Sequence, residues 1–327
     1  MLVISCAALC IAVLAHSEGA RAPVLSLERT IPMPNVEGRI DHLSLDVNNE
    51  RLFVAALGND TVEIIDLKKG ERAATIEGLH EPQGVLYLPA MNRLYVANGK
   101  DGTLVILNAT TLQPIRSIPL GDDADNVRLD PANGHIFVGY GSGALAETDF
   151  EGKRLGDTKL DAHPESFQLE RNGSRIFVNL PGSRKVAVID RKTRSVLTTW
   201  GTGLSLANYP MALDEANHRL FVGCRVPARL IVFDTGKGER VATLHTVGDT
   251  DDIFFDSKRK RIYIIGGDGS VAVVAQQSAN EYKELGRIAT GPGARTGLFS
   301  PDLDRLFVAE RKHGSNTAAI QVFAPGP

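Results

Sequence analysis

The sequence predicts an all-β protein, a seven-bladed β-propeller with four antiparallel strands in each blade, and two observations carry this prediction. First, a pentapeptide of the type Arg-Leu-Phe-Val-Ala recurs seven times, beginning at residues 51, 93, 135, 175, 219, 261 and 305. These copies are 40 to 44 residues apart, which is the length of one four-stranded blade. Second, helical periodicity is absent, and 32 glycines provide for many turns. Because each repeat needs neighbours to bury its faces, residues 23–327 are expected to form one closed ring.

Each repeat divides into four expected strands, named A to D in chain order. Strand B is the recurring pentapeptide, whose consecutive apolar residues are typical of a strand that is covered on both faces. The turn that follows it in the first repeat, Gly58-Asn59-Asp60, is rich in residues that tolerate a positive φ. The strands of the first repeat are therefore predicted over 41–47, 51–55, 62–67 and 71–76.

The same pattern predicts the strands of the later repeats. Those of the second are 84–88, 93–97, 104–109 and 114–120, and those of the third include 127–130 and 136–139, before a glycine-rich turn at 141–143. Those of the fourth are 166–170, 175–179, 186–190 and 195–200. Those of the fifth are 211–214, 220–223, 230–234 and 240–244, and those of the sixth are 253–256, 261–265, 271–275 and 284–289. The seventh repeat has only three, at 298–300, 306–309 and 320–323.

The N-terminal part of the propeller supplies the missing strand. Residues 29–33 read Arg-Thr-Ile-Pro-Met, which matches Arg-Ser-Ile-Pro-Leu at 116–120, the fourth strand of the second repeat. We therefore expect residues 24–32 to complete the seventh blade, close the ring and cover its open edge.

The first 22 residues differ from the rest and are predicted to be a signal peptide. The segment from Leu2 to Ala15 is almost uninterrupted apolar sequence, long enough for a signal-peptide core and too short to span a bilayer. Ala20-Arg21-Ala22 then resembles a cleavage site. The protein is thus expected to be exported, to a periplasm or to the outside of the cell, with no transmembrane segment in the mature chain.

Composition limits the partners. The formal net charge of −3 shows no excess of basic residues, so nucleic acid is not a favoured partner. Of the three cysteines, Cys6 and Cys10 would leave with the signal peptide, and Cys224 alone cannot form an internal disulfide. The mature chain is expected to be a monomer.

One repeat resembles a known family. Tyr95-Val96-Ala97-Asn98 is similar to the Tyr-Val-Thr-Asn signature of the YVTN-repeat propellers, with Ala in place of Thr. The segments 59–66, 81–85 and 183–190 support this resemblance, which covers residues 23–327. The sequence departs from the pattern at Ile264-Ile265, and only the second repeat keeps the Asn. The resemblance implies an exported propeller and assigns no activity.

Alignment of the repeats shows two positions at the start of strand A that vary and are mostly polar. The first is occupied, repeat by repeat, by Asp41, Gln83, Asp125, Glu165, Tyr209, Asp251 and Arg295. The second is occupied by His42, Gly84, Asn126, Ser166, Pro210, Asp252 and Thr296. Variation at a fixed polar position is typical of a site carried by a repeat scaffold. The candidate ligand-binding residues at the channel mouth are Asp41, His42, Gln83, Asp125, Asn126, His163, Glu165, Tyr209, Asp251, Asp252 and Arg295.

Three interpretations of these residues remain open. Polar residues can simply line a wet channel without binding anything. A hard cation such as Ca²⁺ can bind to Asp125 and Glu165, because ring closure places Arg295 between Asp251 and Asp41 and leaves the other two carboxylates uncompensated. Alternatively, the same face of the ring can bind a small molecule, a glycan or a partner protein.

The sequence therefore favours an exported binding or scaffold module, and no catalytic residue is assigned. The alternative is a metal-dependent hydrolase of lactonase type with its site in the central channel. Haem attachment is not expected, because Cys-x-x-Cys-His does not occur in the sequence.

Overall fold

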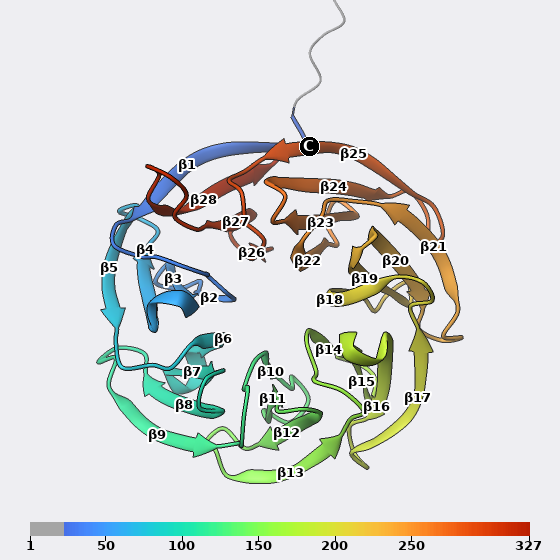
Figure 1. Ribbon diagram of the computed structural model, residues 1–327, viewed down its shortest axis with the longest axis horizontal. Coiled ribbons are helices and arrows are strands. Elements are labelled where there is room, and N and C mark those ends of the chain that lie inside the picture. Colours follow the sequence, from blue (N-terminus) through green and yellow to red (C-terminus); the bar gives the residue numbers. More distant parts are fainter. Residues whose placement is uncertain (1–22) are drawn as a thin grey trace, which may run out of the picture.

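Seven four-stranded sheets form a closed ring around a central channel in the computed structural model, which describes residues 23–327 (Figure 1). Strands β2, β6, β10, β14, β18, β22 and β26 surround the channel, and the fourth strand of each sheet lies at the rim. All pairings within the sheets are antiparallel. The predicted seven-bladed propeller is confirmed. The predicted signal peptide, residues 1–22, lies outside the described residues.

Blades one to four follow the predicted strands closely. Blade one contains β2 (Leu43–Asp46), β3 (Arg51–Ala56), β4 (Thr61–Asp66) and β5 (Glu71–Ile76). Blade two contains β6 (Pro82–Leu88), β7 (Arg93–Asn98), β8 (Thr103–Asn108) and β9 (Pro114–Pro119). Blade three contains β10 (Val127–Leu129), β11 (Ile136–Tyr140), β12 (Ala144–Thr148) and β13 (Arg154–Lys159). Blade four contains β14 (Phe167–Leu169), β15 (Arg175–Leu180), β16 (Lys185–Asp190) and β17 (Ser195–Gly201).

Blades five to seven complete the ring. Blade five contains β18 (Leu206–Asp214), β19 (Arg219–Val226), β20 (Ala228–Asp234) and β21 (Arg240–His245). Blade six contains β22 (Thr250–Asp256), β23 (Arg261–Gly266), β24 (Ser270–Gln276) and β25 (Tyr282–Ala289). Blade seven contains β26 (Gly297–Ser300), β27 (Arg305–Glu310), β28 (Ala318–Pro325) and β1 (Leu25–Met33).

The N-terminal strand closes the ring, as the sequence predicts. Strand β1 pairs with β28, so that the seventh sheet has the order β1-β28-β27-β26. In this pairing Ile31 lies opposite Ile320, and both side chains are fully buried. The two ends of the described chain therefore share one sheet, which is visible in Figure 1 as the blue strand beside the red one.

The recurring aromatic residue of the second strand forms the contact between blades. Phe53 packs with residues of the next blade such as Val85 and Leu94, and Phe221 packs with Ile253 of the next blade in the same way. This aromatic residue is at most 1% exposed in every copy, namely Phe53, Tyr95, Phe137, Phe177, Phe221, Tyr263 and Phe307. Each blade is thus fastened to its neighbour by burial of a large aromatic ring.

A partly buried ion pair recurs at the start of the second strand. Arg51 donates to the carboxylate of Asp46 at 2.8 Å and also to the carbonyl oxygen of Ala109 on the next blade, at 2.9 Å. Arg175 pairs with Glu170 in the same relation, five residues apart. Arg51 therefore joins its own blade to the next one, and Arg175 does so through the carbonyl oxygen of Thr235.

Within residues 23–327 no helix is long and apolar enough to cross a membrane. Cys224 is buried and free, and burial raises the pKa of its thiol to about 12, so that the thiolate form is disfavoured.

Candidate functional site

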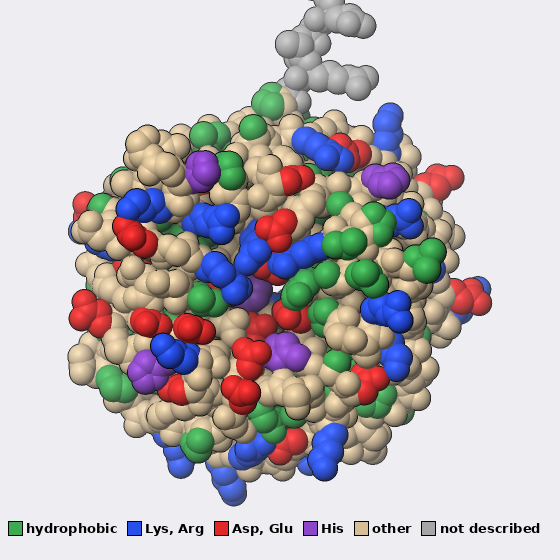
Figure 2. All heavy atoms as spheres, viewed as in Figure 1, with side chains coloured by type: hydrophobic (Ala, Val, Ile, Leu, Met, Phe, Trp, Pro, Cys, Tyr) green, Lys and Arg blue, Asp and Glu red, His purple; other side chains and the backbone are tan. Residues whose placement is uncertain are grey.

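A polar cavity of about 330 Å³ lies at one mouth of the channel. Its walls include all seven residues of the first predicted ring position: Asp41, Gln83, Asp125, Glu165, Tyr209, Asp251 and Arg295. The remaining lining residues are Arg39, His42, Leu57, Glu81, Asp123, His163 and Arg225. In Figure 2 this mouth is the hollow at the centre, with Lys and Arg side chains gathered on one side and Asp, Glu and His side chains on the other.

In three blades the same backbone hydrogen bond holds the residue of the first ring position. The amide of Asp125 donates to the carbonyl of Gly139, and the amides of Asp41 and Glu165 donate to the corresponding Ala55 and Asn179. These acceptors hold the same place at the end of the second strand in each blade. Each such bond fixes the start of the first strand, so that successive blades present different side chains at the same level of the channel.

Arginine residues neutralise the carboxylate on the blade-five to blade-seven side. Asp251 accepts from Arg225 at 2.5 Å and lies 2.9 Å from Nε of Arg295. The Arg225 guanidinium also lies over the Tyr209 ring, 3.9 Å from its centroid. The prediction that Arg295 also pairs with Asp41 is not met, because the arginine partner of Asp41 is Arg39, at 3.2 Å.

His42 lies one level deeper and separates the mouth cavity from a second cavity of about 390 Å³ further along the channel. Its Nδ1 is 3.4 Å from Asp252, and its Nε2 is 3.6 Å from Asp41 and 3.1 Å from the amide nitrogen of Asn126. Burial disfavours the charged imidazole, but Asp252 and Asp41 outweigh it and raise the pKa of His42 to about 10. For Asp41, in contrast, burial itself raises the pKa of the carboxyl group to about 7. Of the second predicted ring, only His42 reaches the mouth; Asp252 lines the deeper cavity, and Asn126 is buried.

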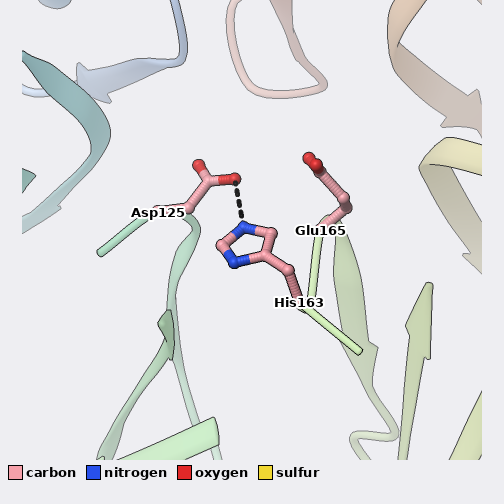
Figure 3. Close-up of side chains that lie close together, drawn as sticks. All are labelled: Asp125, His163 and Glu165. Carbon is pink, nitrogen blue, oxygen red and sulfur yellow. Dashed lines mark ion pairs between the residues drawn. The ribbon is translucent and has the colours of Figure 1, made fainter. Parts of the chain in front are cut away.

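Asp125, His163 and Glu165 come together on the opposite side of the mouth (Figure 3). One ligand-type atom from each lies within 4.8 Å of the others. Asp125 precedes β10 of blade three, and the other two residues lie in the segment between β13 and β14. His163 Nε2 lies 3.9 Å from Asp125, and its Nδ1 lies 2.6 Å from the carbonyl oxygen of Gly141 and 3.5 Å from Asp123.

The charges in this cluster are strongly shifted. Burial raises the pKa of Glu165 well above its usual range, and the neighbouring Asp125 raises it further. Burial opposes the charged form of His163, but the nearby Asp125 carboxylate and the hydrogen bond to the Gly141 carbonyl raise the pKa of this imidazole to about 9. Burial also disfavours the Asp125 carboxylate, yet His163 and His42 hold its pKa below the usual value.

The sequence analysis missed several lining residues. Arg39, Glu81 and Asp123 each lie two positions before a residue of the first ring, as His163 does. Because these residues share one position in the aligned repeats, this spacing of two was the signal that would have found them. Arg225 gives no such signal, because it lies at the end of β19 and reaches the mouth only through the folded hairpin with β20.

The fold and the cavity define a seven-bladed propeller with a charged pocket at its channel mouth, and the comparisons with solved structures agree with that class. A chain of Kuenenia stuttgartiensis hydrazine synthase is similar, with a TM-score of 0.74 and 16% identity, over 88% of this chain and 97% of that one. A chain in a crystal structure of the mitotic checkpoint complex is similar over 97% of this chain and 99% of that one, with a TM-score of 0.76 and 16% identity. At this level of identity the similarity establishes the fold alone. No protein-family model and no curated protein matches the sequence.

Proposed function

We propose that the protein is an exported binding module that takes up a positively charged ligand in the cavity at the channel mouth. One observation carries this proposal: the cavity lining contains six carboxylates against three arginines and two histidines, so its acidic side chains outnumber its basic ones. The carboxylates are Asp41, Glu81, Asp123, Asp125, Glu165 and Asp251, and the arginines are Arg39, Arg225 and Arg295.

The arginines neutralise the charge of only some of these carboxylates. They pair with Asp41 and Asp251, whereas Asp125 contacts only histidines among its cationic partners. The Glu165 carboxylate has no ion pair and no hydrogen bond within residues 23–327. A cation bound beside Asp125 and Glu165 would relieve the repulsion between them.

Thermal unfolding in the presence of three cations and one anion tests this proposal. Spermidine, Ca²⁺ and Zn²⁺ would each be compared with citrate at constant ionic strength, on the wild type and on the Asp125→Asn/Glu165→Gln double variant. A cation that binds the folded state raises its stability, by about 2.7 kcal/mol at 100 times its dissociation constant. We expect at least one cation to stabilise the wild type but not the double variant.

Asp302→Asn is a matched control, because Asp302 is a carboxylate of the deeper cavity and not of the mouth. This variant should keep the cation response of the wild type. If no cation stabilises the wild type, or if the double variant responds as the wild type does, the proposal is wrong.

The second candidate is a metal-dependent hydrolase of lactonase type. Its support is that Asp125, His163 and Glu165 face an open cavity, and three protein ligands beside an open position are typical of a catalytic metal site. Hydrolysis of γ-butyrolactone by protein loaded with Ca²⁺ or Zn²⁺, and its loss in Glu165→Gln, would favour this candidate over simple binding. Absence of hydrolysis with both metals would favour the binding module.

We further propose that the protein belongs to the YVTN-repeat family, is exported and is a monomer. Export rests on the apolar segment from Leu2 to Ala15 and on the cleavage-like Ala20-Arg21-Ala22. Mass spectrometry of the protein recovered from cell fractions is the test, with a mature chain that begins at Pro23 as the expected result. A chain that retains residues 1–22 in the cytoplasm would contradict it.

A further inference from the structure

The cluster of Asp125, His163 and Glu165 has the geometry of a metal site. Figure 3 shows the three side chains turned toward one space, with the imidazole between the two carboxylates. Their ligand-type atoms lie within 4.8 Å of one another. Two zinc–ligand bonds of about 2.1 Å span at most about 4.2 Å. A small rotation of side chains therefore suffices to close the three atoms on one ion.

The hydrogen bond of His163 to Gly141 prepares the imidazole for this role. A carbonyl oxygen only accepts hydrogen bonds, so the 2.6 Å contact requires Nδ1 to carry a proton. The other ring nitrogen, Nε2, is directed toward Asp125 at 3.9 Å, which is too long for a strong hydrogen bond. In metal sites a ligating histidine characteristically donates its second N–H to a carbonyl or a carboxylate in this way.

Glu165 supplies the second, independent observation. Its carboxylate lies in the cavity wall and has no hydrogen-bond or ion-pair partner in the described part of the chain, although Asp251 and Asp41 of the same ring position each have an arginine. The group is therefore free to turn toward an ion without breaking an existing contact.

We propose that Asp125, His163 and Glu165 bind one divalent metal ion of the zinc class, with at least one coordination position open to the mouth cavity. This proposal rests on the proposed function, because it names the positively charged ligand. One imidazole and two carboxylates fit zinc, which accepts nitrogen and oxygen ligands, whereas Ca²⁺ requires six to eight oxygen atoms. A ligand in the cavity would complete the coordination from the open side.

Calorimetric titration of ZnCl₂ into chelator-treated mature protein tests the proposal. We expect one zinc per chain, and Ca²⁺ should bind more weakly. His163→Gln, Asp125→Asn and Glu165→Gln should each weaken zinc binding by more than about 100-fold, the upper end of the effect of removing an outer-shell partner. Circular dichroism would confirm that each variant keeps the β-sheet spectrum of the wild type.

Glu81→Gln is the matched control, because Glu81 is a carboxylate of the same cavity outside the cluster. It should bind zinc as the wild type does. Absence of zinc binding by the wild type, zinc binding that survives His163→Gln, or equal losses in Glu81→Gln and Glu165→Gln would overturn the metal site. If zinc fails while spermidine or Ca²⁺ still stabilises the wild type, only the metal site is wrong. If all three cations fail, the proposed function is wrong as well.

Discussion

His163 is held by the backbone of the preceding blade, because its Nδ1 lies 2.6 Å from the carbonyl oxygen of Gly141 in the turn between β11 and β12. Gly141 has a φ of +61°, a conformation that a β-branched residue adopts only at a cost. The orientation of the imidazole therefore depends on a turn that glycine permits.

The first prediction concerns this turn. Gly141→Val should destabilise the fold by roughly 1–2 kcal/mol through its positive φ, and by displacing the carbonyl it should weaken zinc binding by about 10–100-fold. Urea unfolding and zinc calorimetry measure the two effects.

Gly134→Val is the control for backbone strain. Gly134 also has a positive φ, of +76°, and a Cβ there would meet no atom within 4 Å. It lies in the turn between β10 and β11 and does not line the mouth cavity. This variant should lose similar stability but keep its zinc affinity. Equal zinc affinities in both variants would show that Gly141 does not position His163.

The second prediction concerns the packing between blades. Phe177→Ala and Phe221→Ala should each lower the free energy of unfolding by about 3–5 kcal/mol, because both rings are fully buried against the next blade. Lys192→Ala, at an exposed position, should have an effect near zero. Chemical denaturation measures all three. A cost below about 1 kcal/mol for either phenylalanine would contradict the packing described for that interface.

The third prediction concerns closure of the ring. Removal of residues 23–34 deletes β1, which leaves the edge of β28 unpaired and exposes Ile320, the buried partner of Ile31. The shortened protein should melt at a lower temperature and associate through the exposed edge. Calorimetry and size-exclusion chromatography would compare it with a chain that begins at residue 23. An unchanged melting temperature in a monomeric protein would contradict closure by β1.

The fourth prediction concerns stability in acid. Burial alone would raise the pKa of Asp46, but hydrogen bonds from Asn49 and Arg51 lower it below the usual value. A carboxyl group with a lowered pKa stabilises the folded state above the pKa it has when unfolded, about 3.9, and this contribution is lost as the pH falls through the folded value.

Asp46→Asn should therefore be less stable than the wild type at pH 7, by about 1.5–3 kcal/mol for the lost charged hydrogen bonds, and the difference should shrink toward pH 3. Thermal unfolding at several pH values measures this convergence, with the exposed Asp302→Asn as a control for the loss of one charge. A difference that stays constant from pH 7 to pH 3 would exclude Asp46 as a source of the acid sensitivity.

The sequence predicted the fold because the repeat encodes it locally. Each pentapeptide places an aromatic such as Phe53 or Tyr95 between blades, and the match between residues 29–33 and 116–120 predicted the closing strand. The first ring position was predictable for the same reason, since it holds the same place in every repeat, and in three blades the same backbone hydrogen bond holds it, such as that from Asp125 to Gly139.

The remaining features of the site depend on contacts between blades. The turn of Gly141 meets His163, and Arg225 reaches Asp251 of the next blade, only after the ring has formed. No spacing between residues in the sequence predicts such contacts between blades. The pairing of Asp41 with Arg39 instead of Arg295 is a consequence of the same limit, because a shared level in the channel does not determine which side chains meet.

Anomalous X-ray scattering at the zinc edge, from crystals grown with ZnCl₂, tests most directly the claim that the channel mouth is the functional site. The account predicts one strong peak between the carboxylates of Asp125 and Glu165 and Nε2 of His163, at about 2.0–2.2 Å from each ligand atom. It also predicts loss of that peak in His163→Gln. Fully occupied zinc elsewhere on the molecule, with none among these three residues, would contradict it.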